Sequence, residues 1–103
     1  MPPKRTLRKT IDDVTFVACA SGPGIIRTEA WEDEADEVVR YNLTFINHFL
    51  YPGDNGRVLG YDNAHGMHHR HFCGKVETVS VASFDEVEAL FHAEVKKLRR
   101  KKS

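Results

Sequence analysis

Four histidines stand within eleven residues near the middle of the chain, in the segment Tyr61–His71, which reads YDNAHGMHHRH. The same segment contains an arginine, an aspartate, an asparagine and a tyrosine. Neutral imidazole is a common proton carrier and the commonest metal ligand, and it titrates close to neutral pH. Titratable groups gathered this densely favour a functional site over a purely structural one. We therefore expect the chemistry of this protein to lie in this segment.

The pair His69 and His71, with Arg70 between them, suits the cleavage of RNA through its own 2′-hydroxyl. That reaction needs one group to take a proton, another to protonate the leaving 5′-oxygen, and a cation for the phosphate, but no metal. His69 and His71 are the candidate acid and base, in either order, and Arg70 is a candidate bidentate phosphate ligand. Asp62 is a candidate for orienting an imidazole, and Tyr61 for donating to or stacking on the substrate.

Two other interpretations of the histidine segment stay open. In one, His69, His71 and Cys73 bind zinc or another transition metal, and Asp62 or His65 completes the ligand set. The segment lacks the paired motifs of strong zinc sites, and we expect neither a bound metal nor another cofactor. In the other interpretation the histidines are exposed polar residues that merely tolerate the turn. A separate alternative for the whole protein is a non-enzymatic module, whose histidine face and basic ends dock a partner protein or nucleic acid.

Alternation along the predicted strand 68–73 separates odd from even positions. Because Phe72 is apolar, we expect the even positions to face the core and the odd positions to face solvent. The odd positions are His69, His71 and Cys73.

The elements that must position these residues are short strands followed by one helix. Runs of β-branched and aromatic residues between turn residues predict strands at 14–20, 25–32, 38–46, 57–62, 68–73 and 76–81. Trp31 lies in one of them and is expected to be part of the core. Ser83 and Glu86 form a capping box before a helix with one apolar face. The sequence therefore predicts an α+β fold: an antiparallel sheet of about four to six strands with one C-terminal amphipathic helix packed on one face.

Length and composition indicate a small globular protein. The chain has 103 residues, of which 41% are hydrophobic and 29% charged, which suits one folded domain. We expect a basic, flexible segment at residues 1–10 and a single α+β domain at residues 11–103. No apolar run approaches the roughly 20 residues of a membrane span, and we expect the basic N-terminal segment not to be a secretory signal, because no apolar segment follows it. We therefore expect a cytoplasmic protein with no membrane partner and with reduced cysteines.

The formal net charge is zero, but basic residues concentrate at both ends of the chain. They are Lys4, Arg5, Arg8, Lys9, Lys96, Lys97, Arg99, Arg100, Lys101 and Lys102. A positive surface of this kind can bind phosphate, although a solvated helix end would look the same. We expect Lys96, Lys97, Arg99 and Arg100 to hold the RNA backbone and Asn63 to bind substrate. An exposed edge strand also makes a homodimer possible.

The order of the motifs resembles a known family. The segment GRVLGYDNAHGMHHRH, between VVRYNLTFIN and a short strand followed by SFDEVEALFHAEV, resembles the TumE-like toxins of bacterial and archaeal toxin–antitoxin systems. The resemblance covers roughly residues 24–100. The matching positions are Tyr61, Asp62, Asn63, Gly66, His69, Arg70 and His71.

The resemblance implies the toxin component of a type II pair, whose partner is a cognate, DNA-binding antitoxin protein. It does not by itself imply an activity, and the ribonuclease hypothesis is our inference from the histidines. His65 and His68 stand where the family has other polar residues, which argues against a catalytic role for either.

Overall fold

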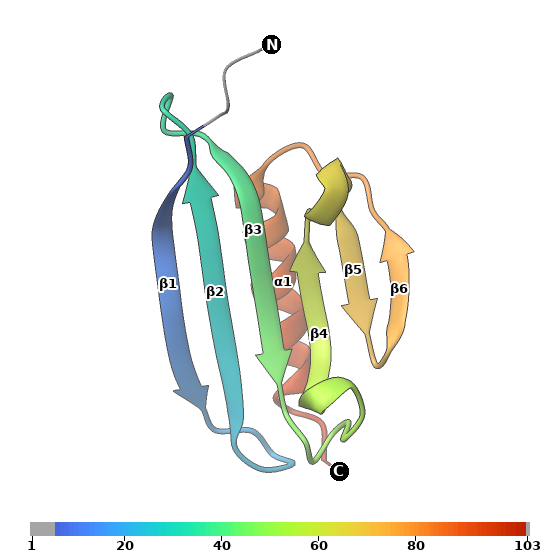
Figure 1. Cartoon of the computed structure of the whole chain (residues 1–103). Coiled ribbons are helices and arrows are strands. Elements are labelled where there is room, and N and C mark those ends of the chain that lie inside the picture. The colour runs from blue at the N-terminus through green and yellow to red at the C-terminus, as the bar shows by residue number, and fades with distance from the viewer. Residues whose placement is uncertain (1–5, 103) are drawn as a thin grey trace.

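The computed structural model describes residues 6–102, except for the side chain of His65. Six strands form one antiparallel sheet, in which each strand pairs with its neighbour along the chain (Figure 1). The strands are β1 (Arg8–Val17), β2 (Gly24–Glu32), β3 (Val38–Ile46), β4 (Arg57–Asp62), β5 (His69–Phe72) and β6 (Lys75–Thr78). Two short 3-10 turns, Asp54–Gly56 and Ala64–Gly66, flank β4, and the helix α1 (Phe84–Leu98) follows β6.

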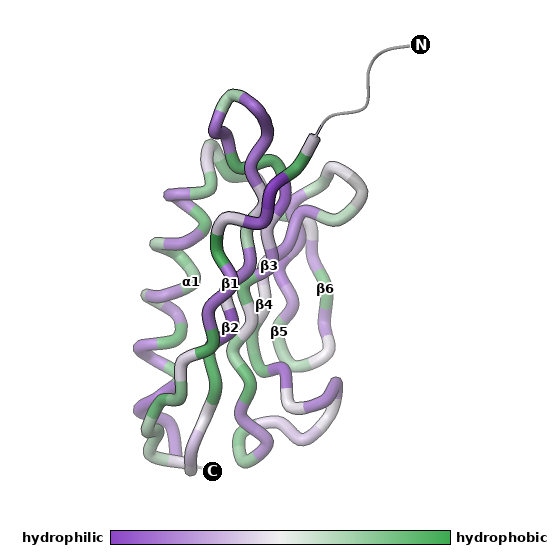
Figure 2. Tube along the Cα trace, turned by 60° about the vertical axis from the view of Figure 1, so that its left-hand side comes forward, coloured by the Kyte–Doolittle hydropathy of each residue, from purple (hydrophilic) through white to green (hydrophobic). Residues whose placement is uncertain are grey.

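The helix lies entirely on one side of the sheet, as the view toward the edge of the sheet shows (Figure 2). No other helix or strand of residues 6–102 covers the opposite side, which we call the open face. This arrangement confirms the predicted α+β fold, with six strands and one helix on one face. No helix within the described residues is long and apolar enough to span a membrane.

The hydrophobic core lies between α1 and the middle strands β3 and β4. Its buried side chains are Ala30, Tyr41, Leu43, Phe45, Val58, Leu59, Tyr61, Val87, Phe91, Val95 and Leu98. The three core residues of β3 alternate along the strand, and the four of α1 recur at helical spacing, as their periodicities require. Because α1 packs on the middle of the sheet, the outer strand β1 is mostly exposed, and Phe16 is 78% exposed.

The boundaries of the first strand differ from the prediction. β1 begins at Arg8 and ends at Val17, whereas the apolar run predicted residues 14–20. The mostly polar residues 8–13 pair with β2 through backbone hydrogen bonds, which a pattern of apolar side chains does not reveal. Residues 8–10 of the expected N-terminal segment therefore belong to the sheet, and Lys4 and Arg5 lie outside the described residues.

The start of α1 confirms the predicted N-cap. The Oγ of Ser83 accepts a hydrogen bond from the backbone N–H of Glu86 at 3.2 Å. The carboxylate of Glu86 in turn accepts from the backbone N–H of Ala82 at 2.9 Å, one residue before the position that a capping box requires. A cap of this kind stabilises a helix by about 1 kcal/mol.

Candidate functional site

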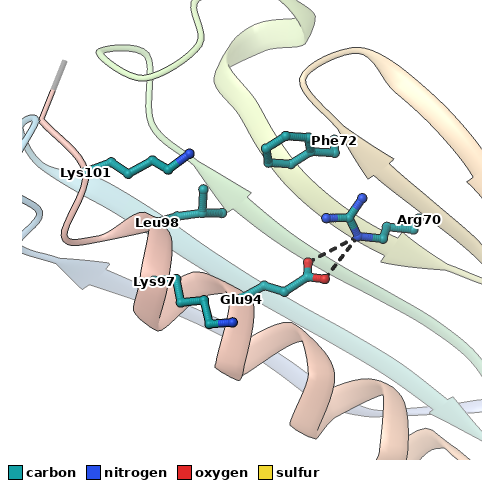
Figure 3. A pocket seen from close by; sticks show the side chains of 6 residues that line it. All are labelled: Arg70, Phe72, Glu94, Lys97, Leu98 and Lys101. Atoms are coloured by element: carbon teal, nitrogen blue, oxygen red, sulfur yellow. Dashed lines mark hydrogen bonds and ion pairs between the residues drawn. The ribbon is translucent and has the colours of Figure 1, made fainter.

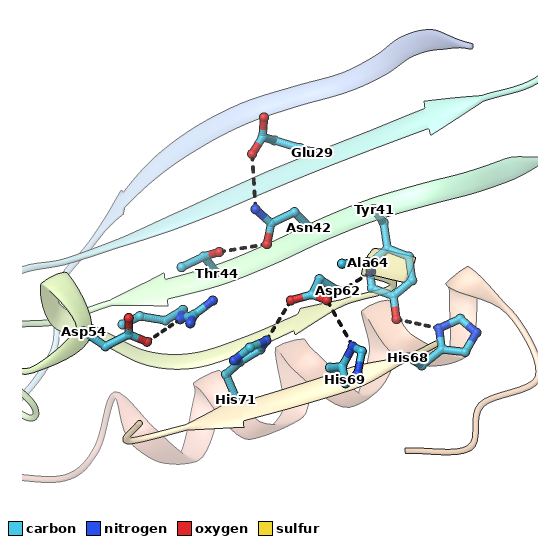
Figure 4. A network of polar contacts seen from close by, with 11 residues as sticks. Glu29, Tyr41, Asn42, Thr44, Asp54, Asp62, Ala64, His68, His69 and His71 are labelled. Carbon is cyan, nitrogen blue, oxygen red and sulfur yellow. Dashed lines mark hydrogen bonds and ion pairs between the residues drawn. The ribbon is translucent and has the colours of Figure 1, made fainter. Parts of the chain in front are cut away.

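The register between β4 and β5 brings the carboxylate and two of the histidines together. Asp62 lies directly opposite His69, and Gly60 lies opposite His71. Since side chains alternate along a strand, Asp62, His69 and His71 share one side of the sheet. That side is the open face, where the two imidazoles point toward Asp62 (Figure 4).

The carboxylate of Asp62 lies between the two imidazole rings. Its Oδ2 is 2.7 Å from the Nε2 of His71, and its Oδ1 is 3.5 Å from the Nδ1 of His69. An ionised carboxylate only accepts hydrogen bonds, so the Nε2 of His71 carries the proton and donates it. The Nδ1 of His71 is buried and has no hydrogen-bond partner among the described residues. The hydrogen bond to Asp62 thus fixes the tautomer and orientation of His71.

His69 is the more accessible of the two imidazoles. Its side chain is 24% exposed, compared with 16% for His71. Within the described residues its Nε2 makes no hydrogen bond, and the centres of the two rings are 6.5 Å apart. His69 is therefore the ring that is free to exchange a proton with a molecule bound on the open face.

Arg70 and Tyr61 lie on the other side of the sheet, toward α1. The Nε of Arg70 donates to both carboxylate oxygens of Glu94, at 3.1 and 3.2 Å (Figure 3). The hydroxyl of Tyr61 donates to the same carboxylate at 3.1 Å. Burial, and then the charge of Glu94, raises the pKa of Tyr61, so this hydroxyl stays protonated.

The sheet therefore divides the five residues that the sequence had grouped as one catalytic cluster. The odd–even alternation was predicted, and it separates Arg70 from His69 and His71 as expected. The guanidinium of Arg70, held by Glu94 beneath the sheet, does not reach a phosphate bound beside the two histidines.

Arg57 is a cation on the open face that the sequence analysis missed. Its side chain lies over Gly60, where an added Cβ would be 3.1 Å from the Cδ of Arg57. Gly60 is the residue opposite His71, so the missing side chain leaves room for Arg57 beside that imidazole. The Nε of Arg57 donates to Asp54 at 2.7 Å. The sequence signal for this arrangement is a glycine inside an otherwise apolar strand, which indicates a close approach.

A cavity of about 330 Å³ opens on this face beside Asp62. Side chains of β2, β3 and β4 line it, among them Glu29, Trp31, Arg40, Asn42, Arg57 and Asp62. Two of these side chains are hydrogen-bonded to each other: the amide of Asn42 donates to Glu29 at 3.5 Å, and it also accepts from the hydroxyl of the neighbouring Thr44 at 3.3 Å (Figure 4). The face beside the imidazoles is therefore polar and hollowed.

The side chain of Asn63, a predicted substrate ligand, instead makes two hydrogen bonds to the backbone of β3. Its Oδ1 accepts from the N–H of Tyr41 at 3.0 Å, and its Nδ2 donates to the carbonyl of Val39 at 2.9 Å. The side chain thus continues the pairing of β3 just beyond the end of β4. His68 is also engaged, because its Nδ1 is 2.8 Å from the hydroxyl of Tyr41. Burial, followed by the charge of Asp62, raises the pKa of Tyr41 to about 12.

The cations at the end of α1 do not lie beside the histidines. Lys97 lines a cavity of about 200 Å³ between α1 and β5, together with Arg70 and Phe72 (Figure 3). The other three predicted RNA ligands line a separate cavity near the end of β1; they are Lys96, Arg99 and Arg100. Both cavities involve α1, whereas the histidine pair is on the open face.

The alternative zinc ligand set of His69, His71 and Cys73 is not assembled. Cys73 has a positive φ of 48°, which ends the strand alternation, and it packs against the hydrophobic core. It therefore does not continue the row of His69 and His71, contrary to expectation. Among the described side chains, no three or more histidine, cysteine, aspartate or glutamate residues are grouped so that they could hold a metal ion. The side chain of His65 lies outside this description.

Comparisons of the chain with protein-family models, with curated proteins and with solved structures find no match. What the site can do chemically is therefore inferred from its geometry alone. One carboxylate between two imidazoles, next to a polar cavity and a guanidinium, can bind an anionic molecule and move protons to and from it.

Proposed function

We propose that this protein is an endoribonuclease that cleaves RNA without a metal ion. The observation that carries the proposal is the carboxylate of Asp62 between His71 and His69 on the open face. Two imidazoles beside one phosphodiester supply both proton transfers of the reaction. The resemblance of residues 24–100 to TumE-like toxins further supports a cytoplasmic toxin of a type II pair, with a cognate antitoxin as its partner.

The proposed reaction begins at the accessible imidazole. His69 takes the proton of a 2′-hydroxyl, and the 2′-oxygen forms a bond to phosphorus. The bond from phosphorus to the 5′-oxygen breaks, and His71, which enters the reaction doubly protonated, gives that oxygen its Nε2 proton and becomes a neutral imidazole, which leaves a 2′,3′-cyclic phosphate. His71 must exchange Asp62 for the substrate at its Nε2, because its other ring nitrogen is buried. Asp62 orients the rings and stabilises whichever one is charged.

Arg57 takes the phosphate-binding role in this proposal. It lies on the same face as the imidazoles, and it lines the same cavity as Asp62. Arg70 and Tyr61 instead act as positioning residues, because their hydrogen bonds to Glu94 fix β4 and β5 against α1. A guanidinium that binds the phosphate with two hydrogen bonds stabilises the charge that develops in the transition state.

The proposal is tested by incubating the purified protein with total RNA in excess EDTA. We expect cleavage by the wild type, none by the double variant His69→Ala/His71→Ala, and full cleavage by His92→Ala. His92 is an exposed histidine of α1 and controls for the loss of an imidazole elsewhere. Circular dichroism establishes that each variant is folded. Folded wild type that leaves RNA intact would exclude a metal-free ribonuclease, and cleavage by the double variant would place the chemistry elsewhere.

A non-enzymatic binding module is the second candidate. The buried Nδ1 of His71 and the 2.7 Å hydrogen bond from the Nε2 of His71 to Asp62 favour it, since a purely structural histidine would be held in this way. The open face would then dock an antitoxin or a nucleic acid and leave it unchanged. Stable binding of RNA by the wild type, with no product after long incubation, would favour this function over cleavage.

A further inference from the structure

The open face also carries an aromatic–cation cluster that the proposed reaction does not use. Trp31 on β2 is paired in register with Arg40 on β3 and with Lys9 on β1. The Cζ of Arg40 is 5.0 Å from the centre of a Trp31 ring, and the Nζ of Lys9 is 5.1 Å from it. Trp31 is half-buried and outside the core, contrary to expectation, and it lines the same cavity as Asp62.

Arg40 differs from the other cations around this cavity. Lys9 is bound to Glu29 at 2.7 Å, and Arg57 is bound to Asp54 at 2.7 Å. Arg40 has no carboxylate partner among the described residues, and its guanidinium rests on the Trp31 ring alone. Cation–π contacts at exposed sites are weak, whereas bidentate hydrogen bonds to a phosphate are strong. A phosphate in the cavity is therefore able to draw Arg40 away from the ring.

We propose that Trp31 and Arg40 form a nucleotide subsite for single-stranded RNA. Arg40 binds a phosphate, and the base of that nucleotide stacks on the ring that Arg40 uncovers. The cavity continues from Trp31 to Asp62, so this nucleotide lies next to the bond that the histidines cleave. The inference rests on the proposed function, since it takes RNA as the substrate.

The chemistry of the subsite favours single-stranded RNA over duplex RNA. Stacking on a side chain needs a base that is not already stacked in a duplex. Every base has an aromatic face, so a subsite of this kind tolerates different sequences. We therefore expect selection for single strands over duplexes, and only weak selection among bases.

Trp31 is the only tryptophan of the chain, so its fluorescence reports directly on the subsite. The full-length His69→Ala/His71→Ala variant, which the proposal expects to be unable to cleave, is titrated with a short oligouridylate and with a duplex RNA of equal length. We expect saturable quenching by the single strand and much weaker quenching by the duplex. Adding Arg40→Ala should raise the Kd by about tenfold. Adding Lys75→Ala instead, which removes an equal charge next to Phe72 on the α1 side, should leave Kd unchanged.

The role of the aromatic ring is tested with labelled RNA, because replacing Trp31 removes the fluorescence signal. In the same double variant, Trp31→Ala should raise the Kd measured by anisotropy about tenfold, and Trp31→Phe should restore most of the affinity. Circular dichroism and urea unfolding show which variants are folded. Unchanged affinity in both Trp31→Ala and Arg40→Ala would overturn the subsite.

The outcomes separate this inference from the proposed cleavage. If wild type does not cut RNA but the quenching and the effect of Arg40→Ala persist, the subsite stands and the ribonuclease proposal fails. If wild type cuts RNA and the two substitutions change neither rate nor affinity, cleavage stands and the subsite fails. Quenching by a partner protein in the absence of any response to RNA would overturn the subsite and identify a protein-docking surface.

Discussion

The two sides of the β4–β5 pair each carry a polar cluster around one carboxylate, but the clusters join different elements. On the open face, Asp62 contacts the two imidazoles of the neighbouring strand and accepts a hydrogen bond from the backbone N–H of Ala64 at 3.2 Å. On the other side, Glu94 of α1 accepts hydrogen bonds from Tyr61 and Arg70 and so ties the helix to both strands. A charged cluster that crosses from one element to another stabilises the packing, whereas one confined to a solvent-facing surface is free to serve a ligand.

The largest effect is expected on the open face, where Asp62→Asn should abolish RNA cleavage and leave stability almost unchanged. An amide neither stabilises a charged imidazole nor enforces the required tautomer of His71. The cleavage rate in EDTA should fall by a factor on the order of 10²–10⁴. A variant that keeps the wild-type rate would show that the carboxylate takes no part in the reaction.

Bound RNA is expected to extend from the open face to the α1 side. The four helix-end cations Lys96, Lys97, Arg99 and Arg100 lie away from the open face, so an RNA that reaches both must pass around an edge of the sheet. Replacing all four with alanine should reduce the slope of log affinity against log salt concentration by about 3 for a single strand. The slope is measured with the inactive double-histidine variant. An unchanged slope would confine the RNA to the open face.

On the α1 side, Glu94→Ala should lower the free energy of unfolding by about 1–2 kcal/mol, because Tyr61 and Arg70 lose their shared acceptor. The matched control is Glu77→Ala, which removes the other carboxylate bound to Arg70, at 3.2 Å, but is 61% exposed. Exposed pairs contribute little, so this control should change stability by less than about 0.5 kcal/mol. Urea unfolding measures both. Equal effects of the two substitutions would contradict the role assigned to Glu94.

The smallest effect concerns the pH dependence of stability at high pH. The pKa of Tyr41 is raised to about 12 in the folded protein from its ordinary value of about 10, chiefly by burial. Tyr41 therefore contributes stability that is fully present below pH 10 and is lost as the pH rises from 10 to 12. Urea unfolding of Tyr41→Phe should show a shallower decline across this range than the wild type. Some decline should remain, because the pKa of Tyr61 shifts in the same direction.

The sequence predicted most of the fold because its periodicities are local. Alternation identified the strand at residues 38–46 with its observed bounds, and the Ser83 cap located the start of the helix. Local patterns also separated His69 and His71 from Arg70 by face. They did not show that this separation removes Arg70 from the site, because that depends on the Glu94 carboxylate, which comes from a distant part of the chain.

The positions of Trp31, Arg57 and Cys73 depend on features that local sequence patterns do not show. Trp31 was assigned to the core because its local pattern does not show which side of its strand the helix covers. Arg57 escaped notice because its position beside His71 requires both the gap at Gly60 and the pairing of β4 with β5. Cys73 was placed with the histidines because a regular strand was assumed, and its positive φ ends that regularity.

Local unfolding of the sheet is expected to begin at β1, because α1 packs on the middle strands. Since the helix packs on β3 and β4, β1 is fastened by its ladder with β2 and by surface ion pairs more than by burial. Segments with few buried contacts unfold locally at lower free energy than the core, so the amide hydrogens of β1 should exchange with solvent before those of β3. Each such opening also lifts Lys9 from the ring of Trp31. Fraying of an edge strand would thus set how often this aromatic surface is presented to solvent.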